Sequence, residues 1–483
     1  MSVHVSRRTL MQAAAMIGLS ACSADGHSAA AAHNAMRRHN RATTPVAPSV
    51  GDVATRRLER ATFGVTDALR SEVDAAGGFE GWLDAQLANR LPAQGRGTTL
   101  LADIESRLSP VDREQTKKGP QRAEATRLCL ETITGRTVFG AALGADQLRH
   151  RVVDVLADLL HVTSSTQPEL FDICEYDSVL RAGAFGRFAD LVLATARQPA
   201  MLAFLDQMGS RADGGRTPNE NYARELMELH TVGVDGGYDE QDVGEVAHVL
   251  SGWTVDRRSH RFEFRAGWHD LGGFGAADDI IGWKRDTGDV GEAAGVALIE
   301  HLACHPSTAR RVAHLFARRF VSEQISTDDE LVREAAEVFT HHDTAIGPML
   351  RHLLTSDRFA GAATLMIRRP TDLVAHAVRV AGADVSSTHI DSTLELLVGV
   401  MSVLGHVPYG WPSPNGYPTS SAAWSSAGAM ISRWNAMVTL CDPSTQRSSP
   451  AAPTGLRLDP ATLGVSNPSE LVAALCGPDH QVY

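Results

Sequence analysis

The helical character of the chain is clearest in residues 148–159, which read Leu148-Arg149-His150-Arg151-Val152-Val153-Asp154-Val155-Leu156-Ala157-Asp158-Leu159. The apolar positions 148, 152, 155, 156 and 159 are three or four residues apart, as on one face of a helix. A half-buried strand would alternate apolar and polar residues instead. This stretch therefore predicts a helix with one face in the core.

The same spacing recurs through most of the 483 residues. It predicts helices near residues 79–88, 122–134, 184–196, 219–231, 240–251, 306–321, 328–340, 369–381, 391–404 and 425–440. Strand patterns are confined to Arg261–Phe264 and Ile280-Ile281. We therefore expect a mainly α protein: a large helical domain with a small β excursion near residues 260–283.

Composition and glycine-rich breaks indicate the domain organisation. Hydrophobic residues make up 43% of the chain, which is enough for a sizeable core. Residues 51–442 are expected to form the helical domain, either as one unit or as two subdomains that meet near residues 207–217. Residues 443–483 are expected to form a Pro-rich linker and a short C-terminal helix from Pro468 to Cys476.

The charge of the chain excludes one large class of partner. The formal net charge is -12 at pH 7, and the sequence has no long run of lysine or arginine. Proteins that bind nucleic acid neutralise its phosphates with basic side chains. We therefore expect no nucleic-acid partner.

The first residues have the order of parts of a signal peptide. Arg7 and Arg8 stand directly before an apolar stretch that runs from Leu10 to Ala21. This stretch is shorter than the roughly 20 residues that a transmembrane helix needs, so it predicts a signal and not a permanent span. Paired arginines favour export through the twin-arginine (Tat) route, which makes the Tat translocon an expected partner.

Leu19-Ser20-Ala21-Cys22 resembles a bacterial lipobox, in which the cysteine sulfur takes a lipid. We expect residues 1–22 to be a Tat/lipoprotein-type signal, with Cys22 as the lipid anchor and residues 23–50 as a flexible tether. The protein would then sit on the outer face of the cell membrane. The alternative is simple cleavage near residues 29–32, after which the protein would be secreted.

Five cysteines remain once Cys22 is set aside, at positions 129, 174, 304, 441 and 476. They are widely spaced and contain no C-x-x-C pair, so they form neither a zinc-ribbon pattern nor a regular disulfide framework. We expect small core residues, with one disulfide as the alternative.

The most informative stretch runs from Thr217 to His230 and reads TPNENYARELMELH. Thr217, Pro218 and Glu220 have the spacing of a capping box, in which a threonine and a glutamate three residues later satisfy free backbone N–H groups. We therefore expect a helix that starts at Pro218.

One face of this predicted helix carries Asn221, Arg224, Glu225 and Glu228, because these residues are three or four apart. A row of surface ion pairs would show the same pattern. The functional interpretation is that Glu225 or Glu228 faces a cleft as a general base or metal ligand. Arg224 would then hold an anionic group or keep a carboxylate ionised.

Three further positions offer catalytic or ligand groups. His269-Asp270 lies in a Gly-rich loop and places an acid/base group beside a hard oxygen ligand. His305 precedes Pro306 and either caps the following helix or contributes to a site. Glu245 and His248 have the E-x-x-H spacing of metal sites in helical bundles, although one such pair is weak evidence. Familiar motifs such as G-x-S-x-G and H-E-x-x-H are missing from the sequence.

Several of these stretches together resemble a bacterial family catalogued as domain of unknown function 1800 (DUF1800). The resemblance is nearly full length, and its pieces follow in the same order: Arg57-Leu58, Arg60 to Gly64, Asn219 to Glu225, Tyr238, Asp242-Val243, Leu250 to Trp253, His269-Asp270, His305-Pro306, Thr308 to Arg310, Leu404-Gly405, Pro414, Gly416 to Pro418, Trp424 and Arg433.

The resemblance implies a large, mainly helical, exported protein and no known reaction. Relatives often accompany a second exported protein that resembles sulfatases and phosphatases, which gives a further expected partner. The family pattern favours Glu225, Arg224, His269 and Asp270 as catalytic residues, and Asn219, Asn221, Glu220 and His305 as binding residues.

Two departures from the family pattern count against particular mechanisms. His248 stands where relatives look like arginine, which counts against a metal pair with Glu245. Gly272-Gly273 stands where a lysine usually follows the His-Asp pair, which counts against a mechanism that needs that lysine.

Three classes of function remain open. The first is a cell-envelope enzyme that uses acid/base or metal-assisted chemistry. The second is a non-catalytic envelope scaffold or maturation partner of a neighbouring exported enzyme. The third is a lipoprotein that binds a metal or small ligand without turnover. A divalent metal would serve the first or the third class.

Overall fold

A computed structural model describes the chain over residues 52–90, 96–107, 120–164, 171–256, 258–272, 278–286, 290–362, 364–442, 447–449, 452–453 and 455–483. The signal residues Arg7 and Arg8, the lipidation residue Cys22, the tether at 23–50 and Gly273 lie outside the described residues. Within the described part, the expected mainly α fold is confirmed.

The first half of the described chain forms helices where the apolar spacing predicts them. Side-chain caps close the starts of the first two, where Asp52 accepts a hydrogen bond from the Thr55 N–H and Thr66 from the Leu69 N–H. These helices are α3 (Val53–Ala61), α4 (Asp67–Ala75), α5 (Phe79–Leu87), α6 (Arg96–Ser106), α7 (Pro120–Leu143), α8 (Gln147–Leu159), α9 (Phe171–Gly183), α10 (Phe188–Ala196) and α11 (Pro199–Phe204).

The second half continues in the same way. Its helices are α12 (Asn221–Glu225), α13 (Glu240–Val249), α14 (Glu292–Cys304), α15 (Pro306–Phe320), α16 (Glu330–His341), α17 (Ile346–Thr355), α18 (Arg358–Ala362), α19 (Pro370–Val380), α20 (Ile390–Val403), α21 (Ala427–Cys441), α22 (Pro468–Leu475) and α23 (Pro478–Gln481). None of the described helices is both long enough and apolar enough to span a membrane.

Short helical turns fill several connections. They are 3-10 turns at η2 (Gln207–Gly209), η3 (Asp213–Gly215), η5 (Ala266–Trp268), η6 (Ser387–His389), η7 (Ser421–Trp424) and η8 (Pro460–Leu463), and a π turn at η4 (Leu226–His230).

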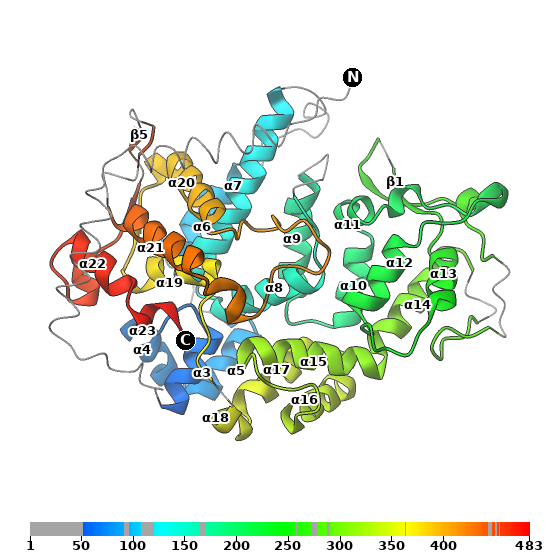
Figure 1. The fold of residues 1–483 in the computed structure, drawn as a ribbon, viewed down its shortest axis with the longest axis horizontal. Coiled ribbons are helices and arrows are strands. Elements are labelled where there is room, and N and C mark those ends of the chain that lie inside the picture. The colour runs from blue at the N-terminus through cyan, green and yellow to red at the C-terminus, as the bar shows by residue number, and fades with distance from the viewer. Residues whose placement is uncertain are drawn as a thin grey trace.

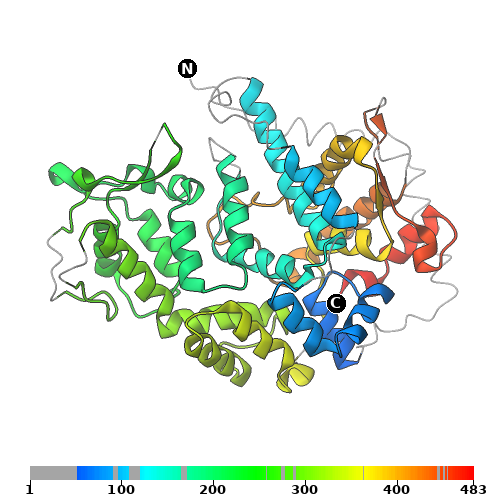
Figure 2. The ribbon, with the colours of Figure 1, turned by 180° about the vertical axis from the view of Figure 1, so that it is seen from behind.

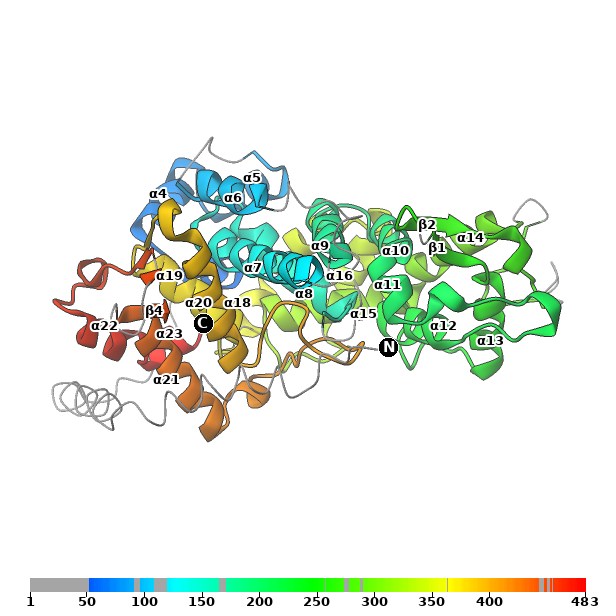
Figure 3. The ribbon, with the colours of Figure 1, turned by 90° about the horizontal axis from the view of Figure 1, so that it is seen from above.

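The helices form an elongated molecule with two ends (Figures 1 and 3). The proximal lobe contains both ends of the described chain, α3–α8 and α19–α23, so segments far apart in sequence lie side by side there (Figures 1 and 2). The distal lobe consists of α10–α14 with the β hairpin. Helices α15–α17 run along one edge beneath α8 and α9 (Figure 1).

Two hydrophobic clusters hold these lobes together. The larger cluster joins buried residues from Leu58 to Tyr409 and includes helices of both lobes. The smaller cluster joins α6 and α7 to α19–α22 and includes residues from Leu100 to Cys476. The C-terminal helices are thus packed on the N-terminal part, as the contacts of α19 and α20 with α7 also show.

The β excursion is confirmed where the sequence places it. Strands β1 (Trp253–Asp256) and β2 (Arg261–Phe264) pair antiparallel, with Trp253 opposite Phe264. An isolated bridge joins Ile280 and Trp283. Two further strand pairs were not predicted, because their strands are too short to show alternation: β3 (Asp384–Val385) with β6 (Leu456–Arg457), and β4 (Arg447–Ser449) with β5 (Ala452–Pro453).

One disulfide joins Cys129 of α7 to Cys174 of α9, across a sequence separation of 45. For this pair the expectation of unpaired core cysteines is wrong, and the alternative of one bridge holds. Cys441 and Cys476 are buried free thiols, and Cys304 is exposed.

Candidate functional site

The helix of the family motif begins later than the sequence predicts. Its first N–H, on Asn221, donates to Asn219 Oδ1 at 2.8 Å, while the Asn219 N–H donates to Ser210 Oγ at 3.1 Å. The capping box expected from Thr217 and Glu220 is therefore wrong. An asparagine side chain that binds the N–H two residues later replaces it, because this local turn competes with helix formation.

Arg224 is the centre of a row of ion pairs at the surface. Its guanidinium lies 2.8 Å from both carboxylate oxygens of Glu240, 3.4 Å from Glu220 and 3.7 Å from Glu228. The hydrogen bonds to Glu240 raise the pKa of Arg224, which is a permanent cation. For these acids, the interpretation as a surface ion-pair row is confirmed.

Glu225 is the acid of this helix that takes no part in the row. Its half-buried carboxylate has no hydrogen-bond or ion-pair partner among the described residues. Burial raises its pKa, the nearby Glu228 adds to the rise, and Arg224 offsets part of it. Glu228 differs because it pairs with Arg224. Enzymes use such unequal neighbours to hold one carboxyl protonated beside an ionised one.

The helix widens into the π turn η4 directly after Glu225. Arg311 of α15 donates two hydrogen bonds, of 3.1 and 2.7 Å, to the Leu229 carbonyl that the wide turn leaves free. His230 ends the turn inside the protein, and burial lowers its pKa to about 3, assisted by Arg311 and His161. π turns are rare and frequently occur at functional sites.

The His269-Asp270 loop is anchored on Ser251, which follows α13. The Ser251 Oγ accepts the Asp270 N–H at 3.1 Å, and the Ser251 carbonyl lies 3.0 Å from His269 Nδ1. Gly252 has φ +84, and a Cβ there would lie 2.7 Å from the Arg265 carbonyl and 3.3 Å from His269 Cβ. This motif glycine is required because the loop passes so close to the backbone.

The His269 imidazole keeps one nitrogen unused. Because Nδ1 faces the Ser251 carbonyl oxygen, it carries the proton and leaves the lone pair on Nε2. Nε2 is buried and has no hydrogen-bond partner. Burial also lowers the pKa of His269, which favours the neutral ring. The result is a neutral imidazole with a free acceptor atom.

His248 contacts the His269-Asp270 loop. Its Nδ1 lies 3.1 Å from the Asp270 carbonyl oxygen, and Glu245 accepts a hydrogen bond of 2.8 Å from Gln241. The Asp270 carboxylate accepts the Gly272 N–H at 3.0 Å. Glu245 therefore bonds to Gln241 of its own helix, and His248 bonds to the backbone of the His269-Asp270 loop.

Ser210 links the two motif stretches. Its Oγ accepts the Asn219 N–H, and its carbonyl accepts the Gly252 N–H at 3.3 Å. The Asn221 side-chain amide lies 3.4 Å from Asp206 on the same side. The structure therefore brings Asn219, Asn221 and the His269-Asp270 loop into one connected region of the distal lobe.

Two predicted residues are not joined to this loop by any described contact. Glu225 lies farther along the motif helix. His305 caps α15, where its Nδ1 accepts the Ser307 N–H at 3.2 Å, and its ring centroid is 6.0 Å from that of His301. The capping interpretation of His305 is confirmed, and burial lowers its pKa.

The predicted residues do not converge as metal ligands in the described part of the chain. The one group there with three ligand atoms within 4.8 Å of one another consists of Glu300, Cys304 and Asp343. Arg187 already pairs with both of its carboxylates. His269 and Glu225 therefore do not form a shared metal site by themselves, and a metal at either residue would need other ligands.

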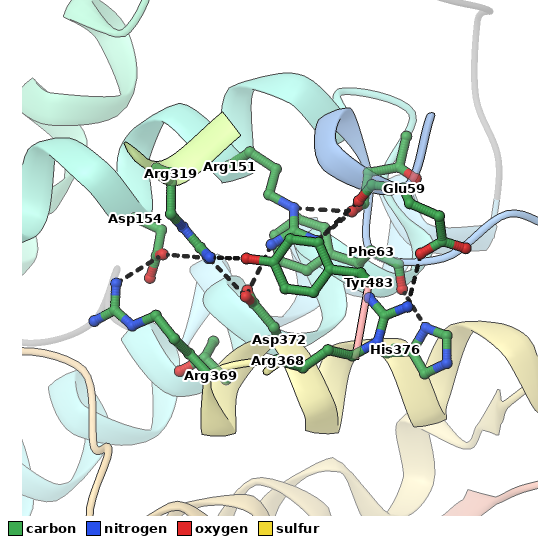
Figure 4. A network of polar contacts seen from close by, with 12 residues as sticks. Glu59, Phe63, Arg151, Asp154, Arg319, Arg368, Arg369, Asp372, His376 and Tyr483 are labelled. Carbon is green, nitrogen blue, oxygen red and sulfur yellow. Dashed lines mark hydrogen bonds and ion pairs between the residues drawn. The ribbon is translucent and has the colours of Figure 1, made fainter. Parts of the chain in front are cut away.

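A second set of polar residues is buried in the proximal lobe (Figure 4). Its charges alternate along a chain of ion pairs that we call the charge ladder. In order, with the distance to the next residue, the ladder is Arg151 (2.9 Å), Asp372 (2.6 Å), Arg319 (2.9 Å), Asp154 (3.2 Å), Arg369 (2.6 Å) and Asp158. It joins α8, α15 and the start of α19.

Tyr483 closes one side of the ladder (Figure 4). Four guanidiniums lie over its ring, at centroid distances of 4.6 Å for Arg60, 4.9 Å for Arg151, 5.1 Å for Arg368 and 5.8 Å for Arg319. Its hydroxyl accepts a hydrogen bond from Arg319. Cations over an aromatic face are attracted by its quadrupole, so one ring compensates several buried arginines.

The other end of the ladder borders a cavity of about 50 Å³ between α8, α9 and the loop after α20. The loop is fastened there by Tyr417, whose N–H donates to Asp158 Oδ1 at 3.0 Å. Gly416, at φ +68, allows this approach because a Cβ would lie 2.5 Å from the Asp158 carbonyl. The polar residues of the lining are Thr137, His150, Asp154, Asp158, His161, Asp177, Arg181, Thr371, His406, Tyr409 and Tyr417.

The acids along the ladder have opposite electrostatic environments. Burial raises the pKa of Asp158, the neighbouring Asp154 adds to the rise, and Arg369 offsets part of it. Burial acts in the same direction on Asp372, but Arg151 and Arg319 overcome it and hold the pKa of that carboxyl far below its usual range. Asp372 is therefore ionised, and Asp158 is the weaker acid.

Sequence reasoning missed the polar face of α8. His150, Asp154 and Asp158 of α8 and His161 just after its end are four, four and three residues apart, and all four line the cavity. Only the apolar positions of this helix, which lie on its opposite face, were considered in the sequence analysis. A second periodic stripe of polar residues was the available signal that both faces of α8 are buried.

Comparison with known protein families shows which family the chain belongs to. The family described as "Protein of unknown function (DUF1800)" matches residues 56–477. The chain belongs to this family. No curated protein and no solved structure matches it.

The DUF1800 motifs divide between two places in the fold. Arg60, Tyr417 and Arg433 are buried in or beside the charge ladder and have structural partners. Glu225 and His269 lie in the distal lobe and keep a polar atom without a partner among the described residues. Arg60 and Arg433 also keep one nitrogen each without a partner, but their other nitrogens are bonded, whereas the Glu225 carboxylate has no partner at all among the described residues.

We predict that Glu225 reacts with a water-soluble carbodiimide and an amine before Glu240 does. The reagent attacks protonated carboxyls, the pKa of Glu225 is raised, and the pKa of Glu240 is lowered by Arg224. Peptide mass spectrometry after brief labelling at mildly acidic pH measures the order, with Glu225→Gln to assign the peptide. Equal labelling of Glu225 and Glu240 would contradict the raised pKa.

A second prediction concerns the ladder. Asp372→Asn should lower the free energy of unfolding by about 3–5 kcal/mol, because it leaves buried arginines without their carboxylate. Asp158→Asn should cost less than about 1 kcal/mol or stabilise the fold, because ionised Asp158 is itself unfavourable when buried. Urea unfolding of both variants beside the wild type checks this order.

The two variants should also differ in pH dependence. The pKa of Asp372 is lowered by folding, so its stabilisation is present above the unfolded pKa and is lost as the pH falls. The pKa of Asp158 is raised, so stability is lost as the pH rises from the unfolded pKa toward the folded one. Asp158→Asn should therefore gain on the wild type as the pH rises, and a constant difference would refute the raised pKa.

Proposed function

We propose that this DUF1800 protein is an exported cell-envelope enzyme that uses Glu225 as its general acid/base. The observation that carries the proposal is the isolation of Glu225: among four neighbouring glutamates, the other three pair with Arg224. A group with a raised pKa and no structural partner is suited to proton transfer near neutral pH.

Export is supported by two independent features. Arg7 and Arg8 precede the apolar stretch of a Tat signal, and Cys22 ends a lipobox-like sequence. The Cys129–Cys174 disulfide belongs to an oxidising compartment, since thiols in the cytosol are kept reduced. We propose a lipid anchor at Cys22 that holds the protein on the outer face of the membrane.

The roles of the other motif residues follow from their contacts. Arg224 would pair with Glu220, Glu228 and Glu240 and lower the pKa of Glu240, so that Glu225 is the acid that exchanges protons. His269 would supply a neutral acceptor through its free Nε2. Asp270, Asn219 and Asn221 would present polar groups for binding on the same lobe. The reaction class is acid/base chemistry on an envelope or extracellular substrate.

A second function has its own observation. The DUF1800 motif residues Arg60, Tyr417 and Arg433 are buried beside the charge ladder and contact residues in or next to it, as expected for a scaffold or maturation partner of a neighbouring exported enzyme. The isolation of Glu225 and of His269 Nε2 favours the enzyme, because a scaffold gains nothing from leaving them without partners.

Export is tested by replacing both signal arginines with lysine. Arg7→Lys with Arg8→Lys should leave the full chain in the cytoplasm, because the Tat route reads the arginine pair. The retained protein should also lack the Cys129–Cys174 bridge, which thiol alkylation reports. Cys22→Ala should still be exported but should leave the membrane fraction. Export of the double-lysine variant at the wild-type level would refute the Tat assignment.

The enzyme is tested on a panel of envelope polymers and simple ester, amide and glycoside substrates. Glu225→Gln should lower any turnover by about 10²–10⁴-fold, the usual contribution of a general acid/base. Glu240→Gln makes the same chemical change at an exposed residue of the ion-pair row and should leave turnover close to the wild type. Equal rates in wild type and Glu225→Gln would exclude the proposed role.

The same samples decide between the two forms of the chemistry. Purified without chelator, wild type, Glu225→Gln and His269→Ala are compared by elemental analysis. One divalent metal per chain that disappears in either variant supports metal-assisted chemistry, or a metal-binding lipoprotein if there is no turnover. No metal in any sample excludes both of these and leaves metal-free acid/base chemistry.

A further inference from the structure

Cys441 and Cys476 stand out among the buried groups that the proposed function does not use. Cys441 is the last residue of α21, and Cys476 directly follows α22. The two helices pack against each other, and both thiols belong to the smaller hydrophobic cluster together with Leu440 and Leu475. The two sulfurs are therefore in the same small core.

The contacts around them hold α22 against α21. Gln481 accepts a hydrogen bond of 2.8 Å from Arg433 of α21 and donates one of 2.8 Å to the Leu475 carbonyl of α22. Burial raises the pKa of both thiols to about 12, and at Cys441 the neighbouring Cys476 adds to the rise. The effect on Cys441 places the Cys476 sulfur nearby, across the interface of α21 and α22.

From this placement we propose that Cys441 and Cys476 form a second disulfide in the exported protein. The chain already closes one bridge, Cys129–Cys174. With Cys22 taken by the lipid, Cys304 would be the single thiol left over, and it is the exposed one.

The chemistry requires a disulfide donor, which we take to be a thiol–disulfide oxidoreductase of the outer compartment or glutathione disulfide. One cysteine thiolate attacks a donor sulfur, forms a mixed disulfide and releases one donor thiol. The second cysteine thiolate then attacks its partner's sulfur and releases the other donor thiol. Two thiols are oxidised, one donor disulfide is reduced, and the two protons go to the released thiolates.

Local opening must precede this reaction, because both thiols are buried and poorly ionised. The bridge would fasten α22 and the segment that follows it. That segment carries Tyr483 into its contacts with four arginines. The second disulfide therefore would hold the tail that closes the charge ladder.

The test uses the mature chain with Cys304→Ser, which removes the exposed thiol and its mixed disulfides. The reduced, unfolded protein is refolded in a buffer of reduced and oxidised glutathione, and free thiols are then blocked and counted by mass spectrometry. We expect the loss of four hydrogens and a peptide that links Cys441 to Cys476. Cys129–Cys174 serves as the internal control for oxidation.

Two outcomes overturn the proposal. The first is a protein in which Cys129–Cys174 closes while Cys441 and Cys476 remain thiols. The second is a Cys441→Ser variant whose tail, measured by hydrogen exchange over residues 468–483, is as protected as in the oxidised parent and does not respond to reductant in either protein. The expected result is faster exchange in this segment for Cys441→Ser and for the reduced parent alike. Because oxidation is imposed in the buffer, the result does not depend on how the protein is exported.

Discussion

The charge ladder is the constraint on which the rest of the structure depends. Asp372 is fully buried between Arg151 and Arg319, and neither arginine can leave water without a carboxylate beside it. Those partners come from α8, α15 and α19, so the three helices can meet in one arrangement that satisfies every charge. The apolar clusters supply most of the burial, and the ladder selects which helices share it.

The two lobes differ in how their polar side chains are bonded. The proximal lobe uses its polar residues on one another, as Tyr417 with Asp158 and Arg433 with Gln481 illustrate. Single atoms of the proximal lobe, such as Asp372 Oδ1 and Arg433 Nη1, lack a partner, but the same side chains are bonded through their other atoms. In the distal lobe the Glu225 carboxylate has no partner at all among the described residues, and His269 keeps Nε2 unpaired. Chemistry on an external substrate needs groups of the second kind, which are held by a rigid framework but not consumed by it.

The helices could be predicted because their signal is local. Apolar spacing located α8, and the helix expected near residues 240–251 is α13, which Asp239 caps in the structure with a full capping box. The cap of α12 was misjudged, because Thr217 and Asn219 both offer a side-chain acceptor near one helix start, and the structure uses Asn219.

The ladder could not be predicted, because its partners are far apart in the chain. Arg369 meets Asp158 across 211 residues and Arg319 meets Asp154 across 165. No local pattern encodes such pairs. For the candidate site, the sequence did identify the motif helix and the His269-Asp270 loop, but it could not separate Glu225 from the acids that Arg224 neutralises.

Because of the π turn after Glu225, the number of residues in this segment decides the direction in which Glu225 points. A π turn contains one residue more than the α turn that it replaces, and each residue of an α-helix turns the chain by about 100°. Deleting a single residue between 226 and 230 would restore an ordinary helix and keep an apolar face for packing. It would also rotate Glu225 away from its present direction relative to Arg311 and α15. A relative with one residue fewer here could therefore share the fold and every motif residue, yet present a different side chain at the position that Glu225 occupies.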